Sequence, residues 1–300
     1  MSHEAALPAP ESRLVTVDGF ALQVRIEGRD TPGRPVLLVI GSALYYARSF
    51  PATLRQKMQL VFVDHRGFAP GNHATDPAAY ALDRLLGDVE AVRLRLGLGQ
   101  VAVFGHSGHG FLALEYAKAY PDAVTHVVMA CLSPDYSVAA HEAGERHFAE
   151  TACPHRKALL AANLARLPAA IADDPSRAFI SYCLLTGPKA WFDPTFDAAR
   201  LWAGVETNMA MFDHVWGTVF RDIDITRGLD RLAVPVLLML GRHDYLVPPA
   251  WLWEVVRDRF ADLTIRVFEH SAHAPFFEEP DQFDVELVGW LDAHPSLQSD

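Results

Sequence analysis

One serine lies at a sharp turn between an expected buried strand and an expected helix. Residues 101–104 form an apolar run that is typical of a strand, and residues 111–120 favour a helix. The segment Gly105-His106-Ser107-Gly108-His109-Gly110 connects the two. A turn of this kind holds a serine hydroxyl clear of the chain, at the carboxyl end of the strand and the amino end of the helix. The segment therefore predicts a nucleophilic Ser107 in a fold that alternates strands and helices.

The turn departs from the pattern G-x-S-x-G, in which small residues lie two before and two after the serine. Gly105 fits this pattern, but position 109 is His and the following glycines are Gly108 and Gly110. A serine with one glycine in place is a weak signal by itself. The rest of the chain therefore has to support the interpretation.

Length and composition favour a globular α/β protein that binds a small molecule. The chain has 300 residues, of which 50% are hydrophobic, which is enough for one large domain or for a core with an inserted subdomain. A net charge of -11 without any basic run argues against a nucleic-acid or anionic-membrane surface. We therefore expect a small-molecule substrate and no nucleic-acid or membrane partner. The composition does not indicate an oligomeric state.

The three cysteines and the N-terminal residues bear on the compartment. Cys131, Cys153 and Cys183 are widely spaced and form no CxxC pair, so neither a disulfide framework nor a zinc cluster is indicated. Residues 1–8 carry no basic and apolar signal sequence, and no apolar run approaches the length of a membrane span. These features predict a cytoplasmic protein.

The apolar runs predict a mostly parallel, doubly wound sheet. Asp18-Gly19 favours a tight turn between two alternating segments, so the chain should open with a hairpin. Continuous apolar runs, as expected of strands covered on both faces, alternate with helical patterns along the chain. The runs are residues 35–40, 60–63, 101–104, 124–130, 234–240 and 263–268. Residues 80–98 and 111–120 are expected helices, and residues 45–57 are expected to form a helix and the segment that leads to it.

A long segment without strands interrupts this alternation. Residues 133–228 contain helical stretches such as 156–167 and 204–220 but no comparable β-run. We therefore predict three parts: residues 1–132 and 229–300 form the core, and residues 133–228 form a helical lid. Ligands of open parallel sheets bind at the carboxyl ends of the strands, so the lid should cover that edge.

An acid and a histidine follow two later strands. The order along the chain is Ser107, Asp244, His273, and each residue comes just after an expected core strand. Acyl transfer needs a base within reach of the serine hydroxyl and a carboxylate that orients the imidazole. The alternatives are His270 for the base and Asp222 or Asp224 for the acid, but neither aspartate follows a core strand.

These features together resemble the α/β-hydrolase superfamily over nearly the whole chain. The resemblance implies that Ser107 is the nucleophile, Asp244 the acid and His273 the base. It rests on the early hairpin, Asp64-His65-Arg66-Gly67, the Gly-His-Ser turn, Gly241-Arg242-His243-Asp244, and Ser271-Ala272-His273-Ala274-Pro275 with Glu278 and Pro280 beyond it.

Within that superfamily the chain looks most like the proline iminopeptidase branch of serine aminopeptidases. The similar segments are residues 62–67, 88–93 and 201–208. In those enzymes lid carboxylates bind the free ammonium group of the substrate, and the resemblance makes Glu206 the candidate here. Further candidate substrate contacts are Tyr45, Tyr46, Trp202 and Phe212.

Two segments depart from that branch. The branch has His-Gly-Gly-Pro-Gly after the first long strand, whereas this chain has Ile40-Gly41-Ser42-Ala43-Leu44; it also has Trp and Gly after the serine, not Gly108 and His109. An oxyanion hole uses backbone N–H groups, so Ser42 and Gly108 can still supply it, at roughly 3 kcal/mol for each donor. We expect the flanking His106 and His109 to pack at the turn.

The sequence thus predicts a cofactor-independent serine hydrolase that cleaves a small ester or amide through an acyl-enzyme. No metal, nucleotide or flavin site is indicated. His141 and His147 lie on one segment, but they lack the spacing of a zinc helix. Three alternatives remain open: a carboxylesterase or lactonase with the same triad, a carbon–carbon hydrolase or cofactor-free oxygenase, and a non-catalytic small-molecule receptor.

Overall fold

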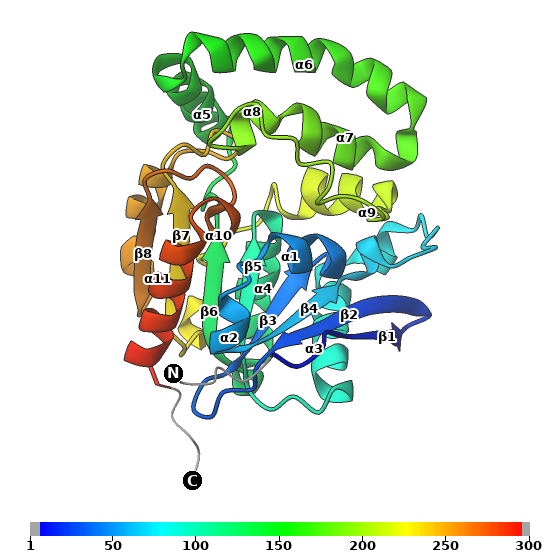
Figure 1. The fold of residues 1–300 in the computed structure, drawn as a ribbon, viewed down its shortest axis with the longest axis vertical. Coiled ribbons are helices and arrows are strands. Elements are labelled where there is room, and N and C mark those ends of the chain that lie inside the picture. The colour runs from blue at the N-terminus through cyan, green and yellow to red at the C-terminus, as the bar shows by residue number, and fades with distance from the viewer. Residues whose placement is uncertain (1–6, 296–300) are drawn as a thin grey trace.

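The computed structural model describes residues 7–295, so part of the N-terminal segment considered above, residues 1–6, lies outside the described residues. Its centre is one eight-stranded sheet in the order β1-β2-β4-β3-β5-β6-β7-β8 (Figure 1). The strands are β1 Glu11–Val17, β2 Phe20–Gly28, β3 Val36–Gly41, β4 Gln59–Asp64, β5 Val101–His106, β6 Val124–Ala130, β7 Val236–Gly241 and β8 Leu263–Phe268.

The predicted hairpin and the parallel core are both confirmed. β1 and β2 pair antiparallel around Asp18-Gly19, and β2 also runs antiparallel to β4. All remaining neighbours are parallel. The inner strands are apolar and buried along their length because helices cover both faces of the sheet.

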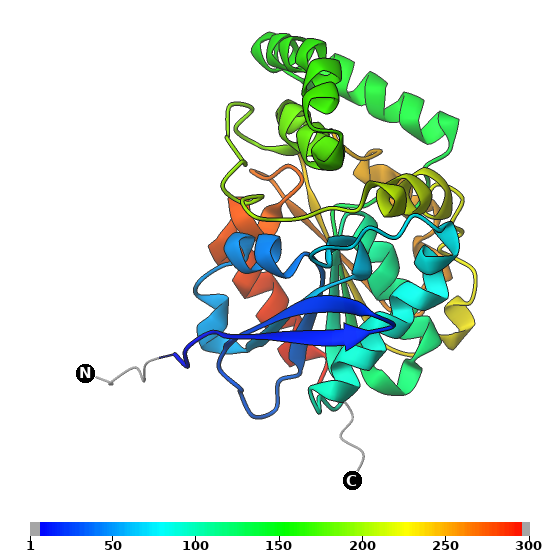
Figure 2. The same ribbon diagram turned by 90° about the vertical axis from the view of Figure 1, so that its right-hand side faces the viewer.

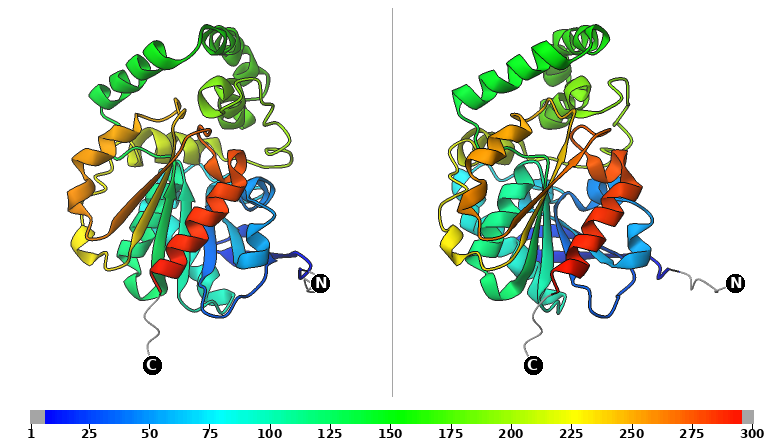
Figure 3. Two further views of the ribbon diagram at one scale, coloured as in Figure 1. Left: turned by 60° about the vertical axis from the view of Figure 1, so that its left-hand side comes forward. Right: turned by 90° about the vertical axis from the view of Figure 1, so that its left-hand side faces the viewer.

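Two layers of helices enclose the sheet. α1 Ala43–Ser49, α2 Leu54–Lys57 and α11 Pro280–Ala293 cover one face, and α3 Leu82–Arg95 and α4 Gly108–Ala119 cover the other (Figures 1 and 3). α4 is buried on nearly all sides, and it begins at Gly108, directly after the turn at the carboxyl end of β5. The serine turn therefore stands on the most enclosed helix of the core.

The long segment between β6 and β7 is helical and lies above the carboxyl edge of the sheet (Figures 1 and 2). Its helices are α5 Val138–Thr151, α6 Pro154–Asp173, α7 Ala178–Leu185, α8 Gly187–Ala190 and α9 Met209–His214, which continues into a π-helical turn over Val215–Val219. The expected helix 156–167 lies within α6. The expected helix 204–220 is wrong at its start, because residues 204–208 are not helical and Asn208 caps α9. The exact domain boundaries stay a prediction.

The cysteines and the hydrophobicity of the helices were both considered in the sequence, and residues 7–295 show the following. All three cysteines are free thiols, so none of them forms a disulfide. In that range no helix combines the length and apolar character that crossing a bilayer would need.

Candidate active site

The turn that carries Ser107 has the strained geometry expected of an exposed nucleophile. Ser107 has φ 55° and ψ -135°, a backbone region that residues with a side chain rarely adopt. Its N–H donates to the carbonyl of Ala130 at 2.8 Å, and its own carbonyl accepts from the N–H of Gly110 at 2.8 Å. These two bonds hold the strained residue between β5 and α4.

Close packing explains which residues around the serine are glycine. A Cβ on Gly105 would lie 2.0 Å from the carbonyl oxygen of His109, and a Cβ on Gly108 would lie 2.7 Å from the ring of Trp216. The crowded side of His109 is thus its backbone. Its side chain leads away from Gly105 toward His65, and for this reason the turn accepts a histidine where the common pattern has glycine.

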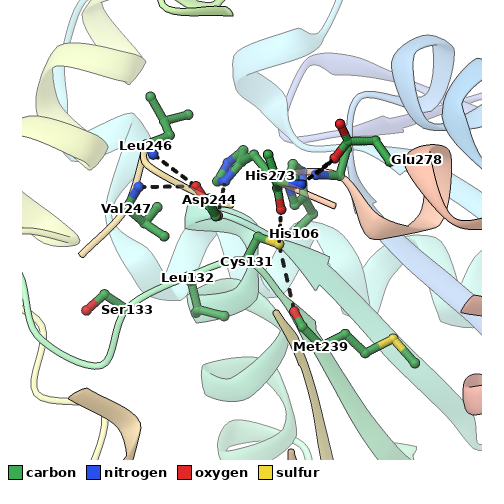
Figure 4. A network of polar contacts seen from close by, with 12 residues as sticks. His106, Cys131, Leu132, Ser133, Met239, Asp244, Leu246, Val247, His273 and Glu278 are labelled. Atoms are coloured by element: carbon green, nitrogen blue, oxygen red, sulfur yellow. Dashed lines mark hydrogen bonds and ion pairs between the residues drawn. The ribbon is translucent and has the colours of Figure 1, made fainter. Parts of the chain in front are cut away.

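His273 and Asp244 form a buried pair beside the serine turn. His273 Nδ1 lies 2.7 Å from Asp244 Oδ2, while Asp244 Oδ1 accepts from the N–H groups of Leu246 at 2.9 Å and Val247 at 3.4 Å (Figure 4). The Ser107 hydroxyl makes no hydrogen bond to any residue of 7–295. Such bonds often form only when substrate binds.

The loop that carries His273 is fixed from both sides. The His273 N–H donates to the carbonyl of Ala190 in the helical segment at 2.9 Å. The Glu278 carboxylate accepts from the N–H groups of Ala272 at 2.7 Å and Phe192 at 2.6 Å. Burial raises the pKa of Glu278 to about 7. The His273 loop is therefore held in common by the core and the segment above it.

The two residues expected to supply the oxyanion hole have backbone N–H groups without a hydrogen-bond partner among the described residues. The N–H of Gly108 opens α4, where helices leave such groups unpaired, and the N–H of Ser42 has no partner among the described residues. The Asp64 carboxyl accepts from the N–H of Ala43 at 2.7 Å and so fixes this loop. Burial raises the pKa of Asp64 to about 8. Both predicted oxyanion residues border the same cavity as Ser107.

That cavity has a volume of about 420 Å³ and lies between the sheet and the helical segment. Aromatic and aliphatic side chains dominate its walls, and no Asp or Glu of residues 7–295 lines it. From the core the lining residues are Ser42, Tyr45, Tyr46, Phe68, His106, Ser107, Gly108, His109, Phe111, Leu246, Val247, His273 and Ala274. From the helical segment they are Tyr136, His141, Phe179, Tyr182, Cys183, Ala190, Trp191, Ala198, Trp202, Trp216, Gly217, Phe220 and Arg221.

The structure separates the predicted substrate contacts into two groups. Tyr45, Tyr46 and Trp202 line the cavity as expected. Phe212 does not: it lies behind Phe179, with the ring centroids 3.9 Å apart.

Glu206 is also outside the cavity. Its side chain is exposed, and its carboxylate accepts from the N–H of Gly71 at 2.9 Å. The expectation that Glu206 binds a substrate ammonium group is therefore wrong in this structure, because the carboxylate points to a surface loop.

The alternative acids and base lie at the surface. Asp222 pairs with Arg221, Asp224 accepts from Thr226, and His270 is exposed. None of these three side chains contacts His273 or Ser107 in a hydrogen bond among the described residues. Asp244 and His273 are the pair that the fold brings together.

Cys131 lies close enough to the Asp244–His273 pair for the three donor atoms to fall within 4.8 Å of one another. Its Sγ, however, contacts the carbonyl of Ala272 at 3.5 Å, and burial raises the pKa of the thiol well above its ordinary value. A metal ion here would have to replace the Asp244–His273 hydrogen bond. The donor set fits the acid–base pair better than a metal centre.

The sequence left several neighbours of the serine turn without a site role. His65, His106 and His109 are buried, and burial lowers the pKa of all three, that of His109 to about 3. Trp216 reaches the turn from the π-helical segment. The motif of residues 64–67 indicates that Asp64 and His65 belong near the site. It does not predict that Asp64 accepts from Ala43 or that His65 contacts His109.

We expect the loss of folding free energy caused by His109→Asn to become smaller as pH falls below about 6.5. The folded-state pKa of His109 lies below the ordinary 6.5, so the unfolded chain takes up its proton first as pH falls. The stability contributed by the neutral ring is complete above about pH 6.5 and declines below it by about 1.4 kcal/mol per pH unit, down to about pH 3. Urea unfolding of both proteins between pH 7.5 and pH 5 measures this difference.

The matched control is Tyr46→Phe, which alters the same cluster without a group that titrates in this range, because burial raises the pKa of Tyr46. Its effect on the free energy of unfolding should be constant from pH 7.5 to pH 5. A constant cost for His109→Asn would contradict a neutral buried ring.

Comparison with known proteins places the chain in one family. Residues 34–280 match the family described as alpha/beta hydrolase fold. AB hydrolase superfamily protein YclE of Bacillus subtilis is 42% identical over 275 residues, covering 92% of this chain and 96% of that protein. Proline iminopeptidase of Lactobacillus helveticus is 24% identical over 301 residues, covering 92% and 96%. The solved proline iminopeptidase of Mycobacterium smegmatis superposes with a TM-score of 0.68 at 19% identity, covering 97% and 100%.

Proposed function

The chain belongs to the α/β-hydrolase family, and we propose that it is a cofactor-independent serine hydrolase of small, uncharged, largely apolar esters. The observation that carries this proposal is the buried Asp244–His273 pair, whose His273 lines the same cavity as the strained Ser107. This is the arrangement of groups that acyl transfer requires.

In the proposed mechanism His273 Nε2 takes the proton of the Ser107 hydroxyl as its oxygen attacks the ester carbonyl. Asp244 fixes the imidazole with Nδ1 protonated and stabilises the imidazolium that forms. The N–H groups of Ser42 and Gly108 stabilise the oxyanion, assisted by the amino end of α4. The imidazolium then protonates the departing alcohol, and water, activated by His273, releases the acid from Ser107.

The cavity walls support an uncharged substrate. Among the described residues no carboxylate lines the cavity, and the guanidinium of Arg221 at its edge is already paired with Asp222 at 2.7 Å. An ammonium group buried there would be unpaired, which is strongly unfavourable. The distant proline iminopeptidase relatives keep an aminopeptidase as the second candidate, but Glu206 does not supply the carboxylate that it would need.

We expect short-chain p-nitrophenyl esters to be hydrolysed in a Ser107-dependent reaction. For amides, proline p-nitroanilide and its N-acetyl derivative form a matched pair that differs in the ammonium charge. We expect the free-amine compound to have a kcat/KM about 100-fold below that of the acetylated compound, because about 3 kcal/mol is lost for an unpaired buried charge. The free amine should also be a poorer substrate than the esters.

The control is Glu206→Gln, which should leave KM for both anilides within about twofold of the native value, since uniform binding contacts act on KM. A strong preference for the free amine, lost in Glu206→Gln, would replace the esterase proposal by the aminopeptidase. Turnover that requires dioxygen would favour the oxygenase, and binding without any turnover would favour the receptor.

A further inference from the structure

Four buried side chains form a continuous polar chain beside the nucleophile that the proposed mechanism does not use. His65 follows β4, Tyr46 lies in α1, His106 ends β5 and His109 lies in the first turn of α4. All four are at most 6% exposed, so each hydrogen bond they make has to be made within the protein.

Both ends of this chain are fixed by backbone groups. The Gly67 N–H donates to His65 Nδ1 at 3.1 Å, and His106 Nε2 lies 2.6 Å from the carbonyl oxygen of His273. A backbone N–H can only donate and a carbonyl oxygen can only accept. His65 Nδ1 is therefore unprotonated, and His106 Nε2 carries a hydrogen.

The three contacts between these ends then follow in one direction. His65 Nε2–H donates to His109 Nε2 at 3.0 Å, and His109 Nδ1–H donates to the Tyr46 hydroxyl at 3.1 Å. The Tyr46 hydroxyl donates to His106 Nδ1 at 3.2 Å. Every group donates once and accepts once, and each imidazole is neutral in a single tautomer. The burial that lowers the pKa of all three histidines agrees with this state.

We propose that His65, His109, Tyr46 and His106 form a directed hydrogen-bond relay. The relay aligns three parts of the site: the nucleophile turn, the loop of residues 41–43 (the oxyanion loop) and the loop of the catalytic histidine. His109 belongs to the nucleophile turn, and the relay ends on the carbonyl of His273 itself. At the oxyanion loop a Cβ on Gly41 would lie 2.2 Å from Cε2 of Tyr46, so the loop packs directly on that ring. Tyr46 and His109 are thus positioning residues, and their kinetic role rests on the proposed hydrolysis.

Two of the relay histidines, His106 and His109, border the cavity. Both nitrogens of each ring already make a hydrogen bond within the relay. Neither ring can accept the serine proton without losing a relay bond. The relay therefore excludes His106 and His109 as the base, whereas His273 Nε2 has no hydrogen-bond partner among the described residues and is free to take the serine proton.

The first test is spectroscopic and does not depend on turnover. Two-bond 1H–15N NMR of the full-length protein labelled at histidine distinguishes the tautomers, with single histidine variants for assignment. We expect neutral rings with hydrogen on Nε2 of His65, Nδ1 of His109 and Nε2 of His106. In Tyr46→Phe the resonances of His106 and His109 should shift most. A His109 ring with hydrogen on Nε2, or a mixture of tautomers, would overturn the relay.

The second test separates hydrogen bonding from packing at position 109. Asn places an amide N–H near Nδ1 and can still donate to Tyr46, whereas Leu has a similar size but no donor. We expect His109→Leu and Tyr46→Phe to lower kcat for ester hydrolysis about tenfold, with KM within about twofold, because misplaced catalytic groups act on kcat. His109→Asn should recover most of that loss.

The control is Tyr116→Phe, since Tyr116 is equally buried but donates to Glu90 at 2.6 Å, away from the cavity. Its kcat should equal that of the native protein. Native kcat in both His109→Leu and Tyr46→Phe would refute the positioning role. Absence of Ser107-dependent hydrolysis in the native protein would instead refute the proposed function and leave the tautomer result standing.

Discussion

Ser107→Ala should lower kcat for ester hydrolysis by about 10⁴-fold or more, because removal of a triad nucleophile leaves only the oxyanion hole and substrate binding. The substitution removes one oxygen from a residue whose hydroxyl makes no hydrogen bond to residues 7–295. The strained backbone at φ 55° is held by main-chain bonds to Ala130 and Gly110, which alanine keeps. Steady-state rates with a p-nitrophenyl ester measure the loss.

A reactive phosphonate gives an independent readout of the same residue. It should add its mass to native protein at Ser107 and add nothing to Ser107→Ala. Equal melting temperatures and near-ultraviolet circular dichroism spectra would establish that the variant is folded. Hydrolysis by Ser107→Ala within tenfold of the native rate would contradict a serine mechanism and direct attention to His273 and Asp244 alone.

The parts of this site that follow strands could be predicted from the sequence. Ser107, Asp244 and His273 each come directly after a continuous apolar run, and the carboxyl ends of parallel strands meet at one edge. The hairpin at Asp18-Gly19 was predictable for the same kind of local reason, since that dipeptide favours a tight turn.

Side-chain direction within the helical segment was not predictable. Glu206 lies in the irregular connection of residues 204–208, and Phe212 lies in α9, which begins at Met209 and not at residue 204 as the sequence predicts. Without a known helix phase, neither residue can be assigned to the cavity side. The structure places Glu206 on the N–H of Gly71 and Phe212 behind Phe179.

The partners of His109 were hidden for a different reason. His65 and Tyr46 lie 44 and 63 residues from His109 along the chain, on separate elements. His106 lies only three residues from His109 but is connected to it through Tyr46. Their contacts depend on how the oxyanion loop packs against α4. A sequence pattern predicts a crowded turn at Gly105, but it does not show that crowding acts on the backbone of His109 and leaves its ring free to turn away.

Asp244→Asn should lower kcat by about 10⁴-fold while leaving KM nearly unchanged, because the substitution reverses the imidazole tautomer. Asp244 Oδ1 accepts from the N–H groups of Leu246 and Val247, so the amide oxygen of Asn takes that position. The amide NH₂ then faces His273 Nδ1 at the place of Oδ2, 2.7 Å away, and donates to it. The ring hydrogen moves to Nε2, where it blocks acceptance of the serine proton.

Nitrogen NMR of His273 tests this cause directly, since hydrogen should be on Nδ1 in native protein and on Nε2 in Asp244→Asn. Asp224→Asn is the matched control, because Asp224 is the exposed alternative acid and bonds to Thr226. It should retain native kcat. If Asp244→Asn kept kcat within tenfold while its His273 tautomer had changed, the acid–base pair would not limit turnover. In that case the relay bond to the His273 carbonyl, and not Asp244, would place the imidazole. Tyr46→Phe should then lower kcat more than Asp244→Asn does.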